Sequence, residues 1–255
     1  MTTPKILYQT WKNYDVPKEF LKNMARWKVL APPEEGWQHI LLSDSDLRKL
    51  VETNVPQHLA KYDSFTKNIE RVDFARCVMM YLGGVYADLD TYPLRKIDTW
   101  LETNKIVFGR EPIEHAREIY SREVVLCNAF MISPPKQQFW LDFMNYIMEN
   151  YEYNFRPVDN TGPMAMTKFY ESNPDQFGNI IITPPCTFFP LKGDGTVTAG
   201  CNMAEDTYVV HEWANTWVPK WFEDDMWKNK RLWFWAMLAI FIAGWLWCWK
   251  KESKK

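Results

Sequence analysis

The segment 69–90 constrains the fold of this chain more than any other part. Apolar residues recur with helical spacing in its first half, at positions 69, 72, 75, 79 and 82. Gly83-Gly84 then ends the helix, because glycine adopts left-handed backbone angles at little cost. Val85-Tyr86-Ala87 predicts a short strand that delivers Asp88 and Asp90 to its end. Strands and helices that alternate in this way predict an α/β sheet.

Asp88 and Asp90 present two carboxylates one residue apart. Mg²⁺ and Mn²⁺ prefer oxygen ligands, and Mg²⁺ usually takes one or two protein carboxylates and leaves positions for substrate phosphates. A diphosphate that is bridged by such a cation becomes a good leaving group. The pair therefore predicts the chemistry that transfers a sugar from a nucleotide-sugar.

A second aspartate pair, Asp44 and Asp46, shows that such a pair alone is weak evidence. It follows the apolar stretch 39–42 and precedes a second helical pattern at 47–51. Ser43 or Asp44 is therefore predicted to cap that helix, with Asp46 favourable to the positive end of the helix dipole. We interpret this pair as structural.

Asp73 and Arg76 lie three residues apart on the predicted helix and so share one of its faces. Their spacing leaves two interpretations open. They form a surface ion pair worth under about 1 kcal/mol, or both approach the same ligand as Asp88 and Asp90.

Five motifs occur in order between residues 4 and 220. They are residues 4–11, residues 71–91 with Trp100, residues 128–134, residues 161–163 and residues 209–217. Together they resemble glycosyltransferase family 32, and above all its branch of yeast Golgi initiating α-1,6-mannosyltransferases. Tyr8 stands where a histidine is usual and Cys77 where a tyrosine is usual. Neither is a carboxylate or a metal ligand, so these departures bear on substrate choice more than on the reaction.

The resemblance implies a GT-A-type fold, in which a Rossmann-like mixed sheet is flanked by helices and the donor lies at the carboxyl ends of the strands. It implies retaining transfer of a hexose, with mannose favoured, from a nucleotide-sugar to a glycan or glycolipid acceptor. GDP-mannose is the favoured donor, and the wider family also uses UDP-sugars. Two alternatives stay open: a metal-dependent nucleotide-sugar hydrolase, and a catalytically degenerate, membrane-tethered glycan-binding protein.

The resemblance also implies a role for particular residues. Mn²⁺ or Mg²⁺ is expected at Asp88, Asp90 and His211, and Asp73 and Arg76 are expected to grip the transferred hexose. The expected donor-binding residues are Trp11, Tyr86, Asn128 and Trp217.

Charge argues against a nucleic-acid-binding protein, and cysteine usage argues against a structural zinc site and a disulfide framework. Basic residues gather from Lys228 onward and leave residues 1–227 net negative, which does not favour a nucleic acid partner. The five cysteines form no CxxC pair, so a structural zinc site is not expected, and their odd number gives no sign of a disulfide framework. Cys77 and Cys127 are predicted to be small core residues.

The C-terminal stretch 232–249 carries no charge, has tryptophans near both ends and is flanked by basic residues. It predicts a single-pass transmembrane helix, with an interfacial helix as the alternative. We expect a catalytic domain at 1–222, a basic juxtamembrane linker at 223–231, the helix at 232–249 and a short basic tail at 250–255. The chain has no N-terminal signal pattern and no N-x-[ST] sequon, which favours a cytosolic catalytic domain over one in the Golgi or ER lumen.

Patterns elsewhere predict further elements. Residues 6–10 and 37–42 indicate strands, and Asp194-Gly195 indicates a hairpin turn. The aromatic stripe at 139–144 is predicted to be core. Helices are expected around 17–29, 44–52, 67–82, 136–149 and 163–171.

Overall fold

The computed structural model describes residues 2–153, 155–173 and 176–216. Residues 1–213 form one compact unit and residues 214–255 a second. The helices and strands of the described residues all lie in the first unit.

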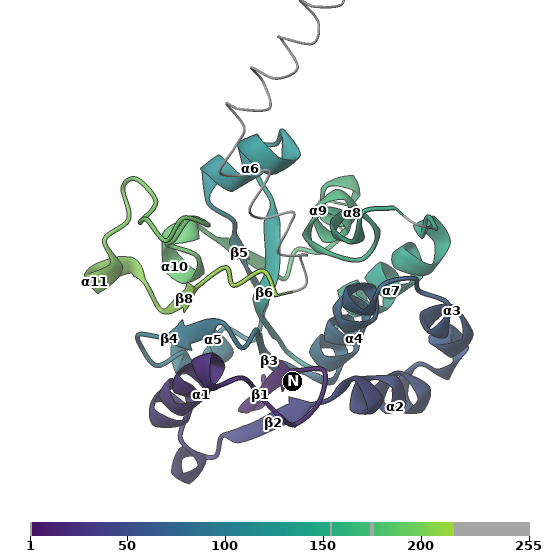
Figure 1. The fold of residues 1–255 in the computed structure, drawn as a ribbon, viewed down its shortest axis with the longest axis horizontal. Coiled ribbons are helices and arrows are strands. Elements are labelled where there is room, and N and C mark those ends of the chain that lie inside the picture. Colours follow the sequence, from purple (N-terminus) through teal and green to yellow (C-terminus); the bar gives the residue numbers. More distant parts are fainter. Residues whose placement is uncertain (1, 154, 174–175, 217–255) are drawn as a thin grey trace, which may run out of the picture. The chain divides into compact units, whose positions relative to one another are not determined.

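A six-stranded mixed sheet lies at the centre of the first unit, in the order β2-β1-β3-β6-β5-β7 (Figure 1). β1 pairs in parallel with β2 and β3, and β5 pairs in parallel with β7. β6 is antiparallel to both β3 and β5, so it alone runs against the other five strands. A separate two-stranded sheet joins β4 to β8. The strands are β1 (Ile6–Thr10), β2 (Gln38–Leu42), β3 (Gly84–Ala87), β4 (Thr91–Pro93), β5 (Ile106–Arg110), β6 (Leu126–Ser133), β7 (Ile180–Thr183) and β8 (Val209–His211).

Helices cover both faces of the large sheet. α2, α4, α7 and α9 lie on one face, and α1, α5 and α10 lie on the other (Figure 1). The helices are α1 (Lys18–Leu30), α2 (Asp44–Asn54), α3 (Leu59–Asp63), α4 (Asn68–Leu82), α5 (Asp98–Glu102), α6 (Ile113–Tyr120), α7 (Gln138–Asn150), α8 (Pro157–Asn160), α9 (Pro163–Ser172), α10 (Pro185–Phe188) and α11 (Met203–Asp206), with 3₁₀ turns η1 (Pro33–Glu35) and η2 (Pro56–His58).

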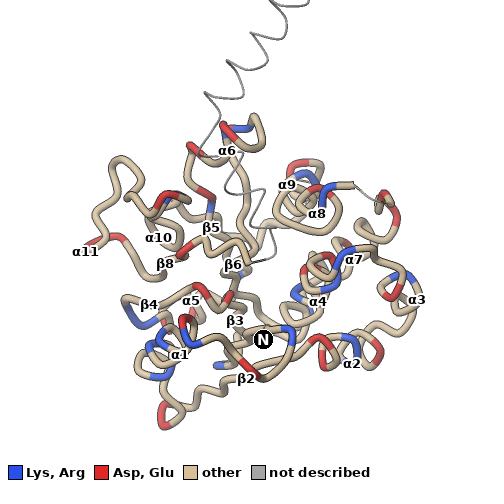
Figure 2. Tube along the Cα trace, viewed as in Figure 1, with Lys and Arg blue, Asp and Glu red and all other residues tan. Residues whose placement is uncertain are grey.

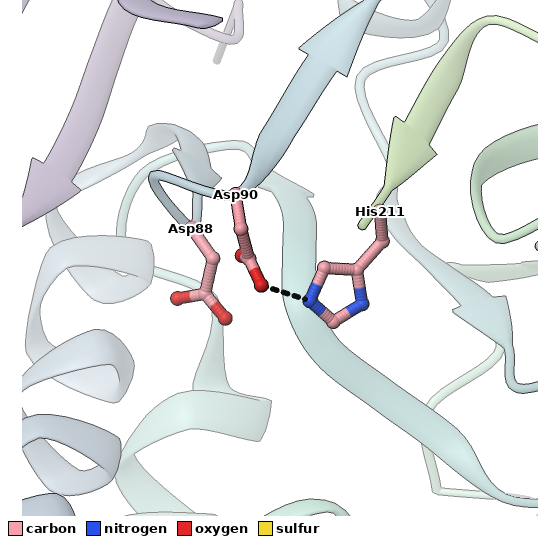
Figure 3. A group of neighbouring side chains, drawn as sticks. All are labelled: Asp88, Asp90 and His211. Atoms are coloured by element: carbon pink, nitrogen blue, oxygen red, sulfur yellow. Dashed lines mark ion pairs between the residues drawn. The ribbon is translucent and has the colours of Figure 1, made fainter. Parts of the chain in front are cut away.

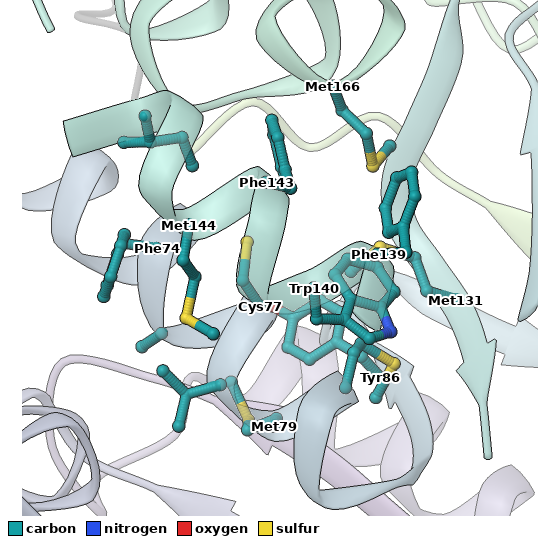
Figure 4. Packing of buried hydrophobic residues seen from close by; sticks show 14 of the residues in the cluster. Phe74, Cys77, Met79, Tyr86, Met131, Phe139, Trp140, Phe143, Met144 and Met166 are labelled. Carbon is teal, nitrogen blue, oxygen red and sulfur yellow. The ribbon is translucent and has the colours of Figure 1, made fainter. Parts of the chain in front are cut away.

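Two apolar clusters fill the space between the sheet and its helices. Successive strand residues point to opposite faces, so Tyr86 packs with Phe74 and Trp140 on the α4 and α7 side (Figure 4). Its neighbour Val85 packs into the cluster on the other face. The predicted core positions are confirmed: the aromatic stripe of α7 is buried at Phe139, Trp140 and Phe143, and Cys77 and Cys127 are buried as well.

The carboxyl ends of five strands meet at one edge of the sheet, because β6 alone runs the other way. Trp11 follows β1, Ser43 follows β2, Asp88 follows β3 and Glu111 follows β5. Asn128 lies near the amino end of β6, which is at the same edge. In open α/β sheets this edge is where ligands bind.

The local predictions for α2 and its neighbours agree with the structure. The expected strands at 6–10 and 37–42 are β1 and β2, and the five expected helices are α1, α2, α4, α7 and α9. Ser43 is the N-cap of α2: its Oγ accepts the N–H of Asp46 at 3.3 Å, and Asp46 Oδ2 accepts the N–H of Ser43 at 2.8 Å. The pair Asp44 and Asp46 therefore begins a helix, as predicted.

Charges of both signs lie along the solvent-facing side of α2 (Figure 2). On α2, Arg48 donates to Asp63 of α3 at 2.8 Å. Such mixed, paired charges are typical of solvated faces and differ from the single-sign surfaces that attract nucleic acid.

The predicted fold class was wrong in one respect. The mixed sheet with helices on both faces agrees with a GT-A-type α/β fold. The prediction also included a transmembrane helix, whereas no helix in the part of the chain that the structure describes is long and apolar enough to cross a bilayer. The stretch 232–249, for which that helix was predicted, lies outside the described residues.

The cysteine prediction is corrected as well. Cys186 and Cys201 form a disulfide across 15 residues of sequence. The odd number of cysteines was a poor guide, because one pair can form a disulfide while other cysteines stay free in the core. Within the bridged segment, the predicted turn at Asp194-Gly195 is confirmed by the antiparallel bridge between Leu191 and Val197.

Gly84 allows β1 and β3 to approach each other closely, and its replacement should destabilise the protein. Its φ is +128°, and an added Cβ would lie 2.7 Å from the carbonyl oxygen of Ile6. We expect Gly84→Ala to lower the free energy of unfolding by at least about 2 kcal/mol in urea titrations, from strain and collision together. Gly36→Ala is the matched control, because Gly36 has a φ of +89° and open space around it. A similar loss in both variants would contradict this explanation.

Candidate active site

Arg76 is the centre of the candidate site. The residue is 6% exposed, its Nη2 donates to Asp88 Oδ1 at 2.8 Å, and its Nη1 lies 3.2 Å from Asp73 Oδ1. The guanidinium also lies over the ring of Tyr86, 4.7 Å from its centroid. A cation that is removed from water needs paired charges, and Asp73 and Asp88 supply them. The surface ion pair that the sequence left open is therefore excluded, because Asp73 and Arg76 are both buried.

Asp88 is held in place by both neighbouring strands of β3. Its backbone N–H donates to the carbonyl of Ala129 at 2.8 Å, and its Oδ1 accepts from Arg76 and from the hydroxyl of Tyr86. That hydroxyl lies 3.1 Å from Thr10 Oγ1, which ties the end of β3 to the end of β1. Burial raises the pKa of Asp88, and the charge of Arg76 opposes this. Both side-chain bonds use Oδ1, so Oδ2 is the candidate atom for a cation.

Asp73, from the motif at 71–91, is hydrogen-bonded to residues of the motifs at 128–134 and 161–163. Asn128 Nδ2 donates to its Oδ1 at 3.0 Å, and Thr161 Oγ1 donates to its Oδ2 at 3.1 Å. Burial raises the pKa of Asp73 to about 6, although Arg76 acts in the opposite direction. A pocket of about 10 Å³, the space of about one water molecule, is lined by these side chains together with Arg76 and Gly162.

Asp88, Asp90 and His211 come together although more than a hundred residues separate His211 from the pair (Figure 3). One ligand atom from each lies within 4.8 Å of the others, and His211 Nε2 is 3.2 Å from Asp90 Oδ2. The pairing of β4 with β8 sets Thr91 opposite His211, and the N–H of Glu212 donates to the carbonyl of Asp90 at 2.9 Å. Burial acts to lower the pKa of His211, but the charge of Asp90, the hydrogen bond to it and the charges of Asp88 and Glu111 together raise the pKa. Two carboxylates and an imidazole are a donor set that fits a divalent cation.

The four predicted donor-binding residues differ in how closely they approach the charged cluster around Arg76. Tyr86 and Asn128 are part of it through Asp88 and Asp73. Trp11 lies directly after β1 at the same edge, where its ring packs edge-to-face against Phe20 of α1, 5.5 Å between centroids. Trp217 lies outside the described residues.

Glu111 is a buried carboxyl at this edge that the sequence interpretation missed. It follows β5, is 4% exposed, and its Oε2 lies 3.9 Å from His115 Nδ1. Burial raises its pKa to about 8, while the charge of His211 acts to lower it. The available signal was its position three residues after the apolar run Ile106–Phe108, because polar residues that follow strands on this edge gather at one site.

Glu111 should make the stability of the metal-free protein depend on pH. Its pKa is about 8 in the folded state against 4.5 ordinarily, so the folded state holds more protons between these values. The free energy of unfolding should therefore fall as pH rises from about 5 to about 8, by up to about 1.4 kcal/mol per pH unit. Urea titrations across this range should show a shallower fall for Glu111→Gln than for the wild type. Glu118→Gln, at an exposed position of α6, should keep the wild-type slope, and equal slopes in all three proteins would refute the assignment.

Comparisons with known proteins agree with this geometry. Residues 17–107 match the family described as glycosyltransferase sugar-binding region containing DXD motif. The chain is 35% identical over 99 residues to inositol phosphoceramide mannosyltransferase 3 of Schizosaccharomyces pombe, a match that covers 38% of this chain and 27% of that protein. It is 22% identical over 249 residues to inositol phosphoceramide mannosyltransferase 2 of the same organism, covering 94% of this chain and 64% of the relative.

Two further matches extend the comparison. The initiation-specific alpha-1,6-mannosyltransferase of Candida albicans is 29% identical over 116 residues, covering 42% of this chain and 29% of the relative. Mouse xyloside xylosyltransferase 1 superposes with a TM-score of 0.49 at 12% identity, covering 85% of this chain and 99% of the other. The chain spans 27 to 64% of the length of the S. pombe relatives. The segment 17–107 is therefore similar to the DXD-containing sugar-binding region of glycosyltransferases, and the curated relatives that match the chain are named as mannosyltransferases.

Proposed function

We propose that this protein is a metal-dependent, retaining glycosyltransferase that moves a hexose from a nucleotide-sugar to a glycan or glycolipid acceptor. One observation carries the proposal: buried Arg76 gathers Asp73 and Asp88 at the carboxyl edge of the sheet, next to Asp90 and His211. A protein that only binds glycans has no need of this buried charge cluster, which costs stability unless every charge is paired.

Asp88, Asp90 and His211 are the residues that would hold the cation, with Mn²⁺ or Mg²⁺ as the proposed ion. Their donor atoms and mutual distances support this assignment. When bound, the cation offsets negative charge that develops on the leaving diphosphate.

Asp73 and Arg76 act on the sugar and on the diphosphate. Arg76 is fixed by two carboxylates and a tyrosine ring, so it presents positive charge without having to reorganise during the reaction. The carboxylate of Asp73, held by Asn128 and Thr161, is the proposed acceptor for hydroxyl groups of the transferred hexose. Trp11, at the end of β1, is the proposed stacking surface for the nucleobase.

Mannose is the proposed sugar and GDP-mannose the proposed donor. The names of the curated relatives support mannose, because they describe mannosyl transfer to inositol phosphoceramide or initiation of α-1,6-mannosylation. The first group of names supports a glycolipid acceptor and the second a glycan acceptor.

Loss of Asp90 should abolish the reaction while the fold survives. We expect Asp90→Ala to reduce Mn²⁺-dependent release of GDP from GDP-mannose by at least about 100-fold, the upper range for loss of a metal-site residue. The full chain should be assayed with GDP-mannose and with UDP-sugars, each with and without EDTA. Asp46→Ala is the matched control, because Asp46 belongs to the capping box of α2 and bonds the hydroxyl of Tyr14, and its loss costs about 1 kcal/mol of stability. Near wild-type turnover in Asp90→Ala would refute the proposed function.

Product analysis separates transfer from hydrolysis. A transferase forms an α-linked mannoside when an acceptor is added and releases less free mannose, whereas a hydrolase yields free mannose whether or not an acceptor is present. Release of mannose that no acceptor diminishes would assign the site to the hydrolase.

Arg76→Lys should lower kcat even though it keeps the positive charge. Lysine cannot contact Asp73 and Asp88 with separate nitrogens of one planar group, as Arg76 does. We expect a drop in kcat of about 10-fold or more, on the order of 1.4 kcal/mol, in steady-state assays of donor turnover. Arg48→Lys, on the exposed α2, should leave kcat unchanged. An unchanged kcat in Arg76→Lys would leave Arg76 with a purely structural role.

A further inference from the structure

The imidazole of His211 is oriented in an unusual way for a metal ligand. Its Nε2 faces Asp90 Oδ2 at 3.2 Å. Its Nδ1 is buried and has no hydrogen-bond partner among the residues that the structure describes. A metal-binding histidine normally donates its second ring N–H to a carboxylate, a carbonyl or water, and this bond fixes the ring. Some other contact must orient the ring here.

The ring of Trp213 supplies that contact. It lies 4.2 Å from the ring of His211 between centroids, tilted by 45°, and Phe189 meets His211 edge-on at 5.9 Å. Trp213 has a backbone φ of +54°, a conformation that costs a bulky residue energy and persists only where surrounding contacts enforce it. In this backbone conformation the indole of Trp213 lies beside the imidazole of His211.

Two contacts enforce the position of Trp213, and both depend on the same segment. Its Nε1–H donates to the carbonyl of Leu191 at 2.7 Å. Its ring meets the ring of His115 at 4.5 Å, and His115 Nε2 accepts the N–H of Gly193 at 2.8 Å. Leu191 and Gly193 both lie in the segment that the disulfide between Cys186 and Cys201 closes.

The closed segment is internally braced. Leu191 pairs with Val197, and the N–H of Lys192 donates to the carbonyl of Thr196 at 2.8 Å. The N–H of Thr198 donates to the carbonyl of Pro190 at 2.7 Å. A loop whose ends are covalently joined and whose backbone is cross-braced by hydrogen bonds loses little further entropy when it holds a side chain.

We propose that Trp213 is a positioning residue for the metal site, held in place by the disulfide-closed loop 186–201. In this arrangement the loop fixes Trp213, the indole fixes the imidazole of His211, and His211 Nε2 stays aimed at the position that it shares with Asp88 and Asp90. The inference rests on the proposed metal-dependent function and adds the structural reason why one of the three ligands is preorganised.

The test is the affinity of the full-length protein for Mn²⁺ alone, measured from the EPR signal of free Mn²⁺. Trp213→Ala should weaken Mn²⁺ binding by about 10-fold or more, as loss of a residue that orients a ligand typically does. Trp213→Phe keeps an aromatic ring beside His211 and should restore most of the affinity. Trp37→Ala is the control, because it removes a side chain of the same size that is buried beside Lys5. Circular dichroism checks that each variant is folded.

A double-mutant cycle tests whether Trp213 affects Mn²⁺ affinity through His211. In a His211→Ala background, Trp213→Ala should weaken Mn²⁺ binding no further, because its effect passes through the histidine. Replacing Cys186 and Cys201 by serine should weaken binding in the same direction, and this effect should also vanish in the His211→Ala background. An unchanged affinity in Trp213→Ala, an equal loss in Trp37→Ala, or a loss that persists without His211 would each overturn the proposal.

The outcome for His211→Ala separates this inference from the proposed function. If His211→Ala binds Mn²⁺ as tightly as the wild type, the proposed metal site is wrong and the positioning role fails with it. If His211→Ala loses affinity and Trp213→Ala does not, the metal site stands and only the role of Trp213 is refuted.

Discussion

The burial of one guanidinium group between two carboxylates is the interaction on which the rest of the site depends. Arg76 contacts Asp73 at 3.2 Å and Asp88 at 2.8 Å; Arg76 and Asp73 are buried, and the side chain of Asp88 is 23% exposed. Burial alone would lower the pKa of Arg76, yet Asp88, Tyr86 and Asp73 raise it, so the cation persists. Removing any member leaves a buried charge without its partner, which is far costlier than losing a surface pair. The chemistry and the stability of this edge are therefore coupled.

The sheet provides the positions that this charge cluster needs. α4 brings Asp73 and Arg76 to the face beside the end of β3, and the reversed strand β6 brings Asn128 to the same edge. Gly84 lets β1 and β3 approach closely, so that Thr10 and Tyr86 can join the two strand ends through their hydroxyl groups. Side chains that are fixed by packed strands and a helix hold their geometry better than side chains on free loops.

His211, the third proposed metal ligand, reaches the site by a different route. His211 depends on the pairing of β8 with β4, which joins residues more than a hundred positions apart, and on aromatic contacts from Trp213 and Phe189. Much of the C-terminal part of the described chain serves this purpose, because the Cys186–Cys201 loop holds Trp213 by its indole N–H. The end of β3 and the end of β8 thus meet at the proposed cation position.

The sequence by itself determined the local elements and the chemistry of the strand end. Helical periodicity placed α1, α2, α4, α7 and α9, and a serine before an aspartate pair located the cap of α2, because helix formation and capping depend on residues three or four positions apart. Family resemblance nominated Asp88, Asp90 and His211, but only the tertiary structure decided that Asp73 and Arg76 are buried and that Glu111 lies at the same edge. It also decided that Cys186 and Cys201 are bridged, against the expectation drawn from an odd cysteine count. Burial and pairing arise between segments that are distant along the chain, and no local pattern encodes the free energy of contacts that form only when the sheet assembles.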